Sequence, residues 1–272
     1  MDAFWGNSIL ESEHTGMVKI SINKSLFLSV ILCGIGFFGR CEDLSAVLAE
    51  AQKKDAAMET SAALALYLQA EKLSPDNPTV LVGIAKQYGE SMVDTTNKDT
   101  KIQRGEISLR YAKKALQVAP DFSDAHLAVA VCYGRLMDYE GAKTKVEYSR
   151  LVKIHADKAI SLDPKSDYAW HLLGRWHRGI AEITPVVRGF AKVVYGGLPD
   201  GSNAEAAKAF RKAISLNPDR LAHYIELGIA LLADGHLKEG KSFIEKGLSM
   251  PVKEKGDPES KAQGKAALAD LE

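Results

Sequence analysis

The chain has 272 residues, 46% of them hydrophobic and 26% charged, which is enough apolar sequence for a large core and excludes an intrinsically disordered protein. Lysine plus arginine and aspartate plus glutamate both number 35, so no overall field favours nucleic acid or a charged membrane as a partner. Three cysteines without a Cys-x-x-Cys pair exclude a disulfide framework and a zinc cluster, so function must depend on local surfaces.

Residues 1–41 are predicted to be a targeting segment. Residues 25–39, SLFLSVILCGIGFFG, carry no charge and are preceded by Lys19 and Lys24. This layout is typical of a signal peptide. A membrane anchor is the alternative. It is less favoured, because a helix of this length rises only about 22 Å, which is short of the roughly 30 Å hydrocarbon core. We therefore expect export to the periplasm or secretory route, or tethering to a membrane, with a cytoplasmic or mitochondrion-associated protein as the alternative.

Residues 42–272 are predicted to form one domain of helical repeats. The same pattern ends at Pro75, Pro120, Pro164 and Pro218, with an alanine five residues before each proline and an alanine or glycine ten residues after it. Bulky residues alternate with these small ones, among them Tyr67, Trp170, Phe210 and Tyr224. Helices approach closely only where one offers a small residue and its neighbour fills the gap, and proline ends a helix because it lacks a donor. The pattern therefore predicts pairs of helices, each pair ending at a proline.

The distances between the prolines predict where the repeats depart from the simple form. With Pro251 as the end of a fifth unit, successive prolines lie 45, 44, 54 and 33 residues apart, where a simple repeat of this kind needs about 34. An excess of about three turns in the first two intervals predicts lengthened helices. The third interval contains Pro185 and the sequence GGLPDG at residues 196–201, which predict a break, an extra helix over residues 186–195 and a loop.

Residues of the third and fourth units resemble the tetratricopeptide repeat. Its Trp-Leu-Gly and Ala-Phe-Ala-Pro pattern is nearly whole in Trp170, Leu173, Gly174, Ala206, Phe210, Ala213 and Pro218. The predicted fold is all-α, a tetratricopeptide-like helical-repeat superhelix of about ten to twelve helices, with lengthened helices and an inserted helix-loop. In such a superhelix the first helix of each pair lines a concave face and the second helix lines the convex face.

A longer stretch resembles one particular family. Asp138 to Gly141 opens a long helix pair, the run His171 to Trp176 follows, and a proline-bearing loop precedes Ala206. Together with the closing segment, residues 46–272 are similar to the regulator of microtubule dynamics family. Members of that family are helical-repeat proteins associated with microtubules, mitochondria or organelle contact sites, so the resemblance implies binding and supplies no catalytic residues. It implies microtubule association only if the chain is cytosolic.

One motif points to a nucleotide, and its context argues against that function. Residues 235–242, GHLKEGKS, match the P-loop pattern. A P-loop needs a strand before it, so that backbone N–H groups converge on phosphate. Residues 221–234 instead have helical periodicity, which predicts an ordinary turn between two helices. Nucleotide binding through this turn is therefore the least favoured function.

The helix predicted over residues 167–178 has two faces. Trp170, Leu173, Gly174 and His177 follow the spacing of a packing face, while His171, Arg175 and Arg178 share the other face. With Lys86 and Arg135 of neighbouring repeats, this second face predicts a basic partner-binding groove: Lys86, Arg135, His171, Arg175 and Arg178. Arginine offers a planar fork of donors that suits carboxylate or phosphate. The alternative is that Arg175 and Arg178 pair internally with acidic residues such as Glu182 and Asp138.

The predicted function is therefore non-enzymatic binding or scaffolding, with a protein or peptide partner that is anionic if the groove is basic. No HExxH motif, nucleophile elbow or isolated pair of carboxylates indicates catalysis, and no cofactor, metal or nucleic acid is expected. The alternative is a lipid-binding or lipid-transfer protein in which the longer helices and residues 186–195 enclose an acyl-sized cavity under basic residues. A closed apolar cavity favours this alternative, and an open polar groove favours a protein partner.

Overall fold

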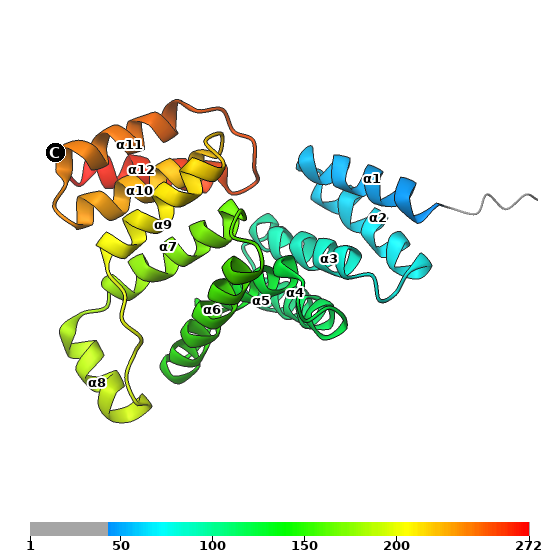
Figure 1. Cartoon of the computed structure of the whole chain (residues 1–272), viewed down its shortest axis with the longest axis horizontal. Helices are drawn as coiled ribbons and strands as arrows, with labels where there is room; N and C mark the ends of the chain where they lie inside the picture. The colour runs from blue at the N-terminus through cyan, green and yellow to red at the C-terminus, as the bar shows by residue number, and fades with distance from the viewer. Residues whose placement is uncertain (1–42, 272) are drawn as a thin grey trace, which may run out of the picture. The chain divides into compact units, whose positions relative to one another are not determined.

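The computed structural model describes residues 43–271, and all the regular secondary structure within them is helical (Figure 1). Residues 42–272 form one compact unit, and the predicted targeting segment lies outside the described residues. The described part contains twelve α-helices and one 3₁₀ helix: α1 (Leu44–Ala56), α2 (Thr60–Leu73), α3 (Pro78–Glu90), η1 (Ser91–Asp94), α4 (Lys98–Val118), α5 (Ser123–Met137), α6 (Ala142–Leu162), α7 (Asp167–Ala181), α8 (Pro185–Tyr195), α9 (Asn203–Leu216), α10 (Leu221–Ala233), α11 (Leu237–Ser249) and α12 (Asp257–Ala269). None of these helices is long and apolar enough to cross a membrane.

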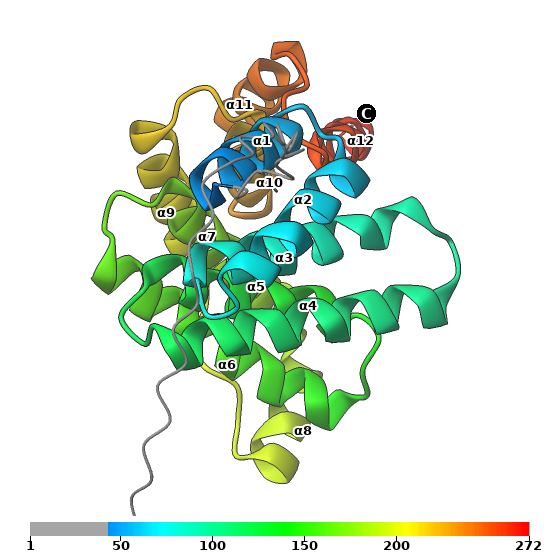
Figure 2. The ribbon, with the colours of Figure 1, turned by 90° about the vertical axis from the view of Figure 1, so that its right-hand side faces the viewer.

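The helices pack in the pairs that the proline pattern predicts. α1 packs on α2, α3 on α4, α5 on α6, α7 on α9 and α10 on α11, and each second helix also contacts the first helix of the following pair. α8 is inserted within the fourth pair and projects from the other helices (Figures 1 and 2). α4 and α6 each have 21 residues, whereas α3 and α5 have 13 and 15. The all-α repeat fold, the lengthened helices and the inserted helix are therefore confirmed.

Proline ends the second helix of every pair. α2, α4, α6, α9 and α11 each end two residues before their proline, since that residue cannot donate to the helix and disfavours a helical residue before it. After each of the first four prolines, a turn of two residues leads into the next first helix. Side chains cap several of these helices; for example, Asn77 accepts hydrogen bonds from the backbone N–H groups of Thr79 and Val80.

Small residues let the paired helices touch. Tyr67 and Phe210 are fully or almost fully buried, and their rings lie against Gly83 and Gly174 of the neighbouring first helices. A Cβ atom on Gly174 would lie 2.6 Å from the Phe210 ring. The alanines five residues before the prolines have no exposed surface at all: Ala70, Ala115, Ala159 and Ala213. The predicted nesting of small and bulky residues is therefore confirmed at Tyr67 and Phe210, whereas Trp170 and Tyr224 are only partly buried. Where it occurs, it makes the contact between helices specific.

Two glycines of α7 provide a direct test of this nesting. We expect Gly174→Ala to lower the free energy of unfolding by about 1–3 kcal/mol, because the new methyl group overlaps the Phe210 ring. Gly179→Ala should instead raise it by up to about 1 kcal/mol, because nothing lies within 4 Å of the added Cβ and alanine favours the helix. Urea unfolding measures both changes, and equal shifts for the two variants would contradict the nesting.

Candidate partner-binding surface

The predicted binding residues lie on the first helices of three pairs. Lys86 is on α3, Arg135 is on α5, and His171, Arg175 and Arg178 are on α7. The structure divides them into two clusters, which we name by their helices. In the α7–α10 cluster, α7 contacts α10 directly, and in the α3–α5 cluster, α3 contacts α5.

The α7–α10 cluster is organised around one buried carboxylate. The Glu226 side chain on α10 is only 5% exposed, and it accepts a 2.9 Å hydrogen bond from Nε of Arg178. Nε of Arg175 lies 3.2 Å from its other oxygen. Arg178 also donates to Glu182 at 2.5 Å, so this predicted internal pair is present, whereas neither arginine pairs with Asp138 within residues 43–271. The buried charge of Glu226 is thus compensated by two arginines.

The two arginines of this cluster differ in how much of their guanidinium group is free. The Arg178 side chain is 18% exposed and divides its donors between Glu226 and Glu182. The Arg175 side chain is 53% exposed and uses only Nε, so within the described residues its terminal nitrogens have no protein partner. The internal-pairing interpretation therefore describes Arg178 well and Arg175 only in part.

His171 is buried, which corrects the expectation that it lines an open groove. Its residue surface is 6% exposed, and its Nδ1 atom lies 2.9 Å from Nδ1 of His223 on α10. His223 in turn lies 3.0 Å from the Asp167 carboxylate through Nε2. Since the carboxylate only accepts, Nε2 of His223 carries a proton, and Nδ1 of His171 donates to Nδ1 of His223 in the neutral pair. α10 thus covers α7 at His171, whereas Arg175, about one turn further along the same face, stays half exposed.

Burial makes this histidine pair sensitive to pH. Burial and then the neighbouring His223 and three arginines lower the pKa of His171 well below its usual range. Burial also lowers the pKa of His223, although Asp167 opposes the shift. The pKa of Asp167 is itself lowered, because its hydrogen bond with His223 and the charge of Arg220 outweigh the effect of burial. Charging both rings would place two N–H groups against each other.

In the α3–α5 cluster Lys86 is paired and Arg135 is not. The Lys86 ammonium lies 2.7 Å from Asp55 on α1 and 3.7 Å from Glu90. No hydrogen bond or ion pair joins the Arg135 guanidinium to another residue within 43–271. The guanidinium lies against Gly89, where a Cβ atom would collide with it. Burial raises the pKa of Glu90, and the charges of Lys86 and Arg135 oppose that rise, which places both cations near this carboxylate.

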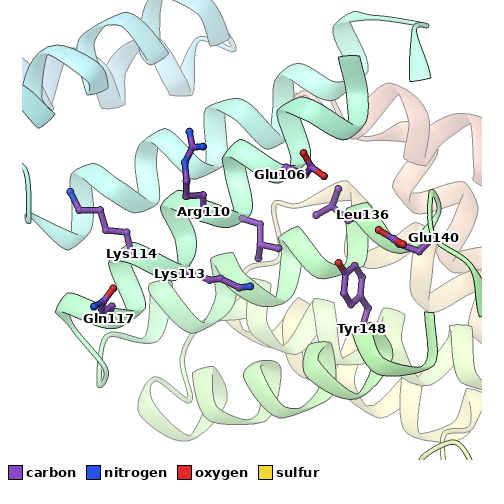
Figure 3. A pocket seen from close by; sticks show the side chains of 9 residues that line it. Glu106, Arg110, Lys113, Lys114, Gln117, Leu136, Glu140 and Tyr148 are labelled. Carbon is purple, nitrogen blue, oxygen red and sulfur yellow. The ribbon is translucent and has the colours of Figure 1, made fainter. Parts of the chain in front are cut away.

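A cavity of about 680 Å³ lies between the second helices α4 and α6 and the end of α5 (Figure 3). Its walls combine charged side chains with apolar surface: Glu106, Leu109, Arg110, Lys113, Lys114, Gln117, Leu136, Glu140 and Tyr148. Neither this cavity nor a second one of about 460 Å³ beside Thr60 and Lys255 is lined by α8. The part of the expectation that has residues 186–195 enclose an acyl-sized cavity is wrong, because five large apolar side chains of α8 are exposed. The cavity in Figure 3 instead lies beside the lengthened helices α4 and α6.

The P-loop-like turn joins two helices, as predicted. α10 ends at Ala233, α11 begins at Leu237, and Gly235 takes the left-handed conformation with φ of 86°. The preceding residues are therefore helical rather than extended. The Lys241 ammonium lies 3.9 Å from Glu245 one turn further along α11, so it is directed along its own helix. The turn lacks the strand that a phosphate-binding loop needs.

Sequence reasoning missed the partners of the predicted residues on α10. Glu226 and His223 sit in LAHYIELGIALL, a helix that is otherwise almost wholly apolar. A glutamate within such an apolar run could have predicted a buried ion pair, because a buried carboxylate requires a cationic partner. The spacing within α7 could not show that α10 covers that face.

Comparisons with known proteins agree with the fold and confirm the predicted family. The family model described as "Regulator of microtubule dynamics protein 1-3" matches residues 47–272. Regulator of microtubule dynamics protein 1 of Mus musculus is 31% identical over 165 residues, which cover 60% of this chain and 54% of the relative. The rat protein of the same name is 30% identical over 178 residues, covering 65% and 57%. The chain thus spans about half the length of these curated relatives.

Solved structures support the same fold class. A thermophilic tetratricopeptide-repeat protein of Thermus thermophilus has a TM-score of 0.61 at 17% identity, covering 84% of this chain and 100% of that one. PilF of Pseudomonas aeruginosa has a TM-score of 0.52 at 12% identity, covering 86% and 93%. At these identities the similarity shows the fold alone.

Glu226→Gln tests the charge compensation in the α7–α10 cluster. We expect it to lower the free energy of unfolding by about 1–3 kcal/mol, because two arginines lose a buried counter-charge. The matched control is Glu239→Gln, which weakens the exposed pair with Arg211 and should change stability by less than about 0.5 kcal/mol. Urea unfolding at neutral pH compares them. A loss for Glu226→Gln no larger than the control's would show that the buried carboxylate contributes nothing specific.

The histidines predict a loss of stability in mild acid. A third histidine, His155 on α6, lies 3.0 Å from His126 between their Nδ1 atoms, and burial followed by the charge of His126 lowers its pKa. The pKa values of His171, His223 and His155 are thus lowered in the folded state from the usual 6.5, so the unfolded chain binds more protons below that pH. The free energy of unfolding should be constant above about pH 7 and fall as the pH drops below about 6.5. His171→Gln keeps a donor for His223 and removes one titrating group, so it should flatten the fall, whereas exposed His236→Gln should leave it unchanged. Thermal unfolding from pH 7.5 to 5.5 measures both slopes; an unchanged slope for His171→Gln contradicts this assignment.

Proposed function

The chain belongs to the regulator of microtubule dynamics protein 1-3 family, and from that premise we propose that it is a non-enzymatic scaffold that binds a protein or peptide across its first helices. The observation that carries the proposal is the presence of two arginines, Arg135 and Arg175, whose guanidinium groups retain unused donors within the described residues. The similarity to tetratricopeptide-repeat proteins supports a protein or peptide as the partner.

Free arginine donors favour an anionic partner. A guanidinium group binds a carboxylate through two parallel N–H bonds, and these charge-assisted bonds are stronger than neutral ones. Arg175 presents its terminal nitrogens beside Glu226, which already holds its Nε and so restricts the orientation of the fork. A carboxylate side chain or chain terminus of a peptide fits such a donor. Arg135 offers the same chemistry on α5.

The other predicted residues have a positioning role in this proposal. Lys86 bridges α3 to Asp55 of α1, and Arg178 bridges α7 to Glu226 of α10. A partner that used these two cations would have to displace an internal carboxylate, which costs more than binding a free donor. His171 is buried against His223 and is not part of the proposed contact surface.

Microtubule association and cellular location are further parts of the proposal that follow from the relatives and from the first 41 residues. The names of the relatives refer to microtubule dynamics, and this chain covers about half of their length. A chain that stays in the cytoplasm, or on the cytoplasmic side of a membrane, meets microtubules, and an exported chain does not. We retain export or membrane tethering as the predicted location, with a cytoplasmic or mitochondrion-associated protein as the alternative.

A peptide selection tests the proposed surface and does not require an identified partner. The full chain is used to select binders from a random-peptide library, and the affinities of the selected peptides are measured for Arg135→Ala/Arg175→Ala. We expect acidic peptides and a loss of affinity of about tenfold to a hundredfold in the double variant. The control Arg110→Ala/Arg211→Ala removes two exposed arginines from the second helices α4 and α9 and should leave affinity unchanged. Selected peptides that bind the Arg135/Arg175 variant as well as the wild type would contradict the proposal.

Co-sedimentation with assembled microtubules, using the wild type and the same two double variants in parallel, tests the family-based part separately. Pelleting that depends on Arg135 and Arg175 would place the microtubule on the same surface. Pelleting that does not depend on them would assign it to another surface, and absence of pelleting would remove microtubules as the partner.

A further inference from the structure

The inserted helix α8 carries an apolar face that no described part of the chain covers. Its large apolar side chains remain open to solvent, with Val186 and Val193 more than four-fifths exposed and three others at least half exposed: Val187, Phe190 and Val194. Ala191 is the one buried residue of α8. Apolar patches of this kind on a soluble domain usually mark an interaction surface.

The exposed residues form a single face of the helix. Val186, Phe190 and Val193 follow the spacing i, i+4, i+7, and Val187 and Val194 lie beside them. Arg188 and Lys192, four residues apart, lie on the opposite side, and Ala191 lies between Val187 and Arg188. Ala191 is buried and Arg188 donates to the main-chain carbonyls of Ile180 and Ile183, so this part of the helix faces the helix pairs. The apolar face is therefore directed away from the rest of the domain, in agreement with the projecting position of α8 in Figures 1 and 2.

Hydrogen bonds hold α8 in place where apolar packing does not. Thr184 and Pro185 start the helix, and Gly196, in the left-handed conformation with φ of 74°, ends it. Arg150 on α6 donates to the main-chain carbonyls of Tyr195 and Gly197 at 2.7 and 2.6 Å. With the bonds from Arg188, both ends of the helix are tied to α6 and α7 through main-chain carbonyls. The helix is thus positioned without using its apolar face.

Shape and charge favour a lipid surface as the occupant. The face is convex and belongs to one helix, and neither described cavity includes it, so it has no groove to receive a peptide. The charged residues of α8 are Arg188 and Lys192, and the nearest acidic residues, Glu182 and Asp200, lie outside the helix. Lys192 lies one turn after Arg188, on the side of α8 opposite the apolar face; its side chain is exposed and has no ion pair within the described residues. A helix with one apolar face, a lysine on its polar side and no acidic residue of its own has the composition of helices that lie in the interface of an anionic bilayer.

We propose that α8 is a membrane-contact helix that lies flat in the interface of an anionic bilayer. Val186, Phe190 and Val193 enter the boundary between headgroups and acyl chains, while the Lys192 ammonium stays among the anionic headgroups. The two arginine ties then orient the helix pairs relative to the membrane. This surface is separate from Arg135 and Arg175, so it stands or falls independently of the proposed function.

A position-specific probe is needed, because residues 25–39 could hold the full chain on vesicles by themselves. Phe190→Trp places an indole on the apolar face of α8, and Val93→Trp places one at a similarly exposed apolar position on η1. The full-length variants are mixed with phosphatidylcholine vesicles that contain phosphatidylserine and brominated acyl chains. We expect the added tryptophan fluorescence to be quenched at position 190 and unchanged at position 93. Equal quenching, or none at position 190, would overturn the proposal.

Vesicle flotation measures the contribution of α8 to binding. We expect Val186→Ser/Phe190→Ser/Val193→Ser to reduce the partition coefficient on phosphatidylserine-containing vesicles by about tenfold or more, since three buried apolar side chains are lost. The matched control Val93→Ser/Leu237→Ser/Val252→Ser removes three apolar residues exposed elsewhere and should partition like the wild type. Lys192→Gln should weaken binding to anionic vesicles and leave binding to pure phosphatidylcholine unchanged.

Two readouts keep a negative result informative. Circular dichroism and thermal unfolding should match the wild type for every variant, because all the replaced side chains are exposed. Light scattering without vesicles tests for a second copy of the chain as the occupant. A dimer that the α8 triple variant converts to a monomer would overturn the membrane assignment, as would unchanged flotation of that variant.

Discussion

The whole fold depends on the close approach of helices at small residues. Tyr67 can fill the space beside Gly83, and Phe210 the space beside Gly174, only because neither glycine has a side chain. The buried alanines of the second helices allow the same approach from the other side. Each helix pair is thereby held at one register against the next, and a charged residue on one first helix reaches a defined position on its neighbour. The contact of Arg178 with Glu226, which are far apart in sequence, follows from that register.

The departures from the simple repeat lengthen second helices or insert α8, and they leave the first helix of each pair unchanged. The lengthening affects α4 and α6, which form the walls of the cavity in Figure 3. The insertion that contains α8 lies between α7 and α9, yet these two helices still pack as a pair and α7 still meets α10. Elaborations can therefore add surfaces, such as the exposed face of α8, without disturbing the line of first helices.

Local chemistry made the fold predictable, and long-range packing made the site hard to predict. Proline positions and the alternation of Ala85, Ala130, Gly174 and Gly228 with bulky residues are local signals, and they predict the helix pairs, the lengthened helices and the inserted helix. The role of His171 depends on which helix covers its face of α7, and nothing within α7 contains that information. The same holds for Glu226: its buried position needs two arginines about fifty residues earlier in the chain, and nothing within α10 identifies them. The exposure of α8 was missed because an apolar segment is expected to be buried, and only the arrangement of Arg150 and Arg188 shows that hydrogen bonds hold it instead.

The proposed function rests on two arginines of the first helices, Arg135 and Arg175, that keep unused donors for an anionic protein segment. The most direct test is to place the photo-reactive amino acid benzoylphenylalanine at Gly179, an exposed position one turn after Arg175, and at Lys212, an exposed position on the second helix α9. With a selected acidic peptide bound, the account predicts a covalent adduct from position 179 and none from position 212. An adduct from position 212 alone would contradict it.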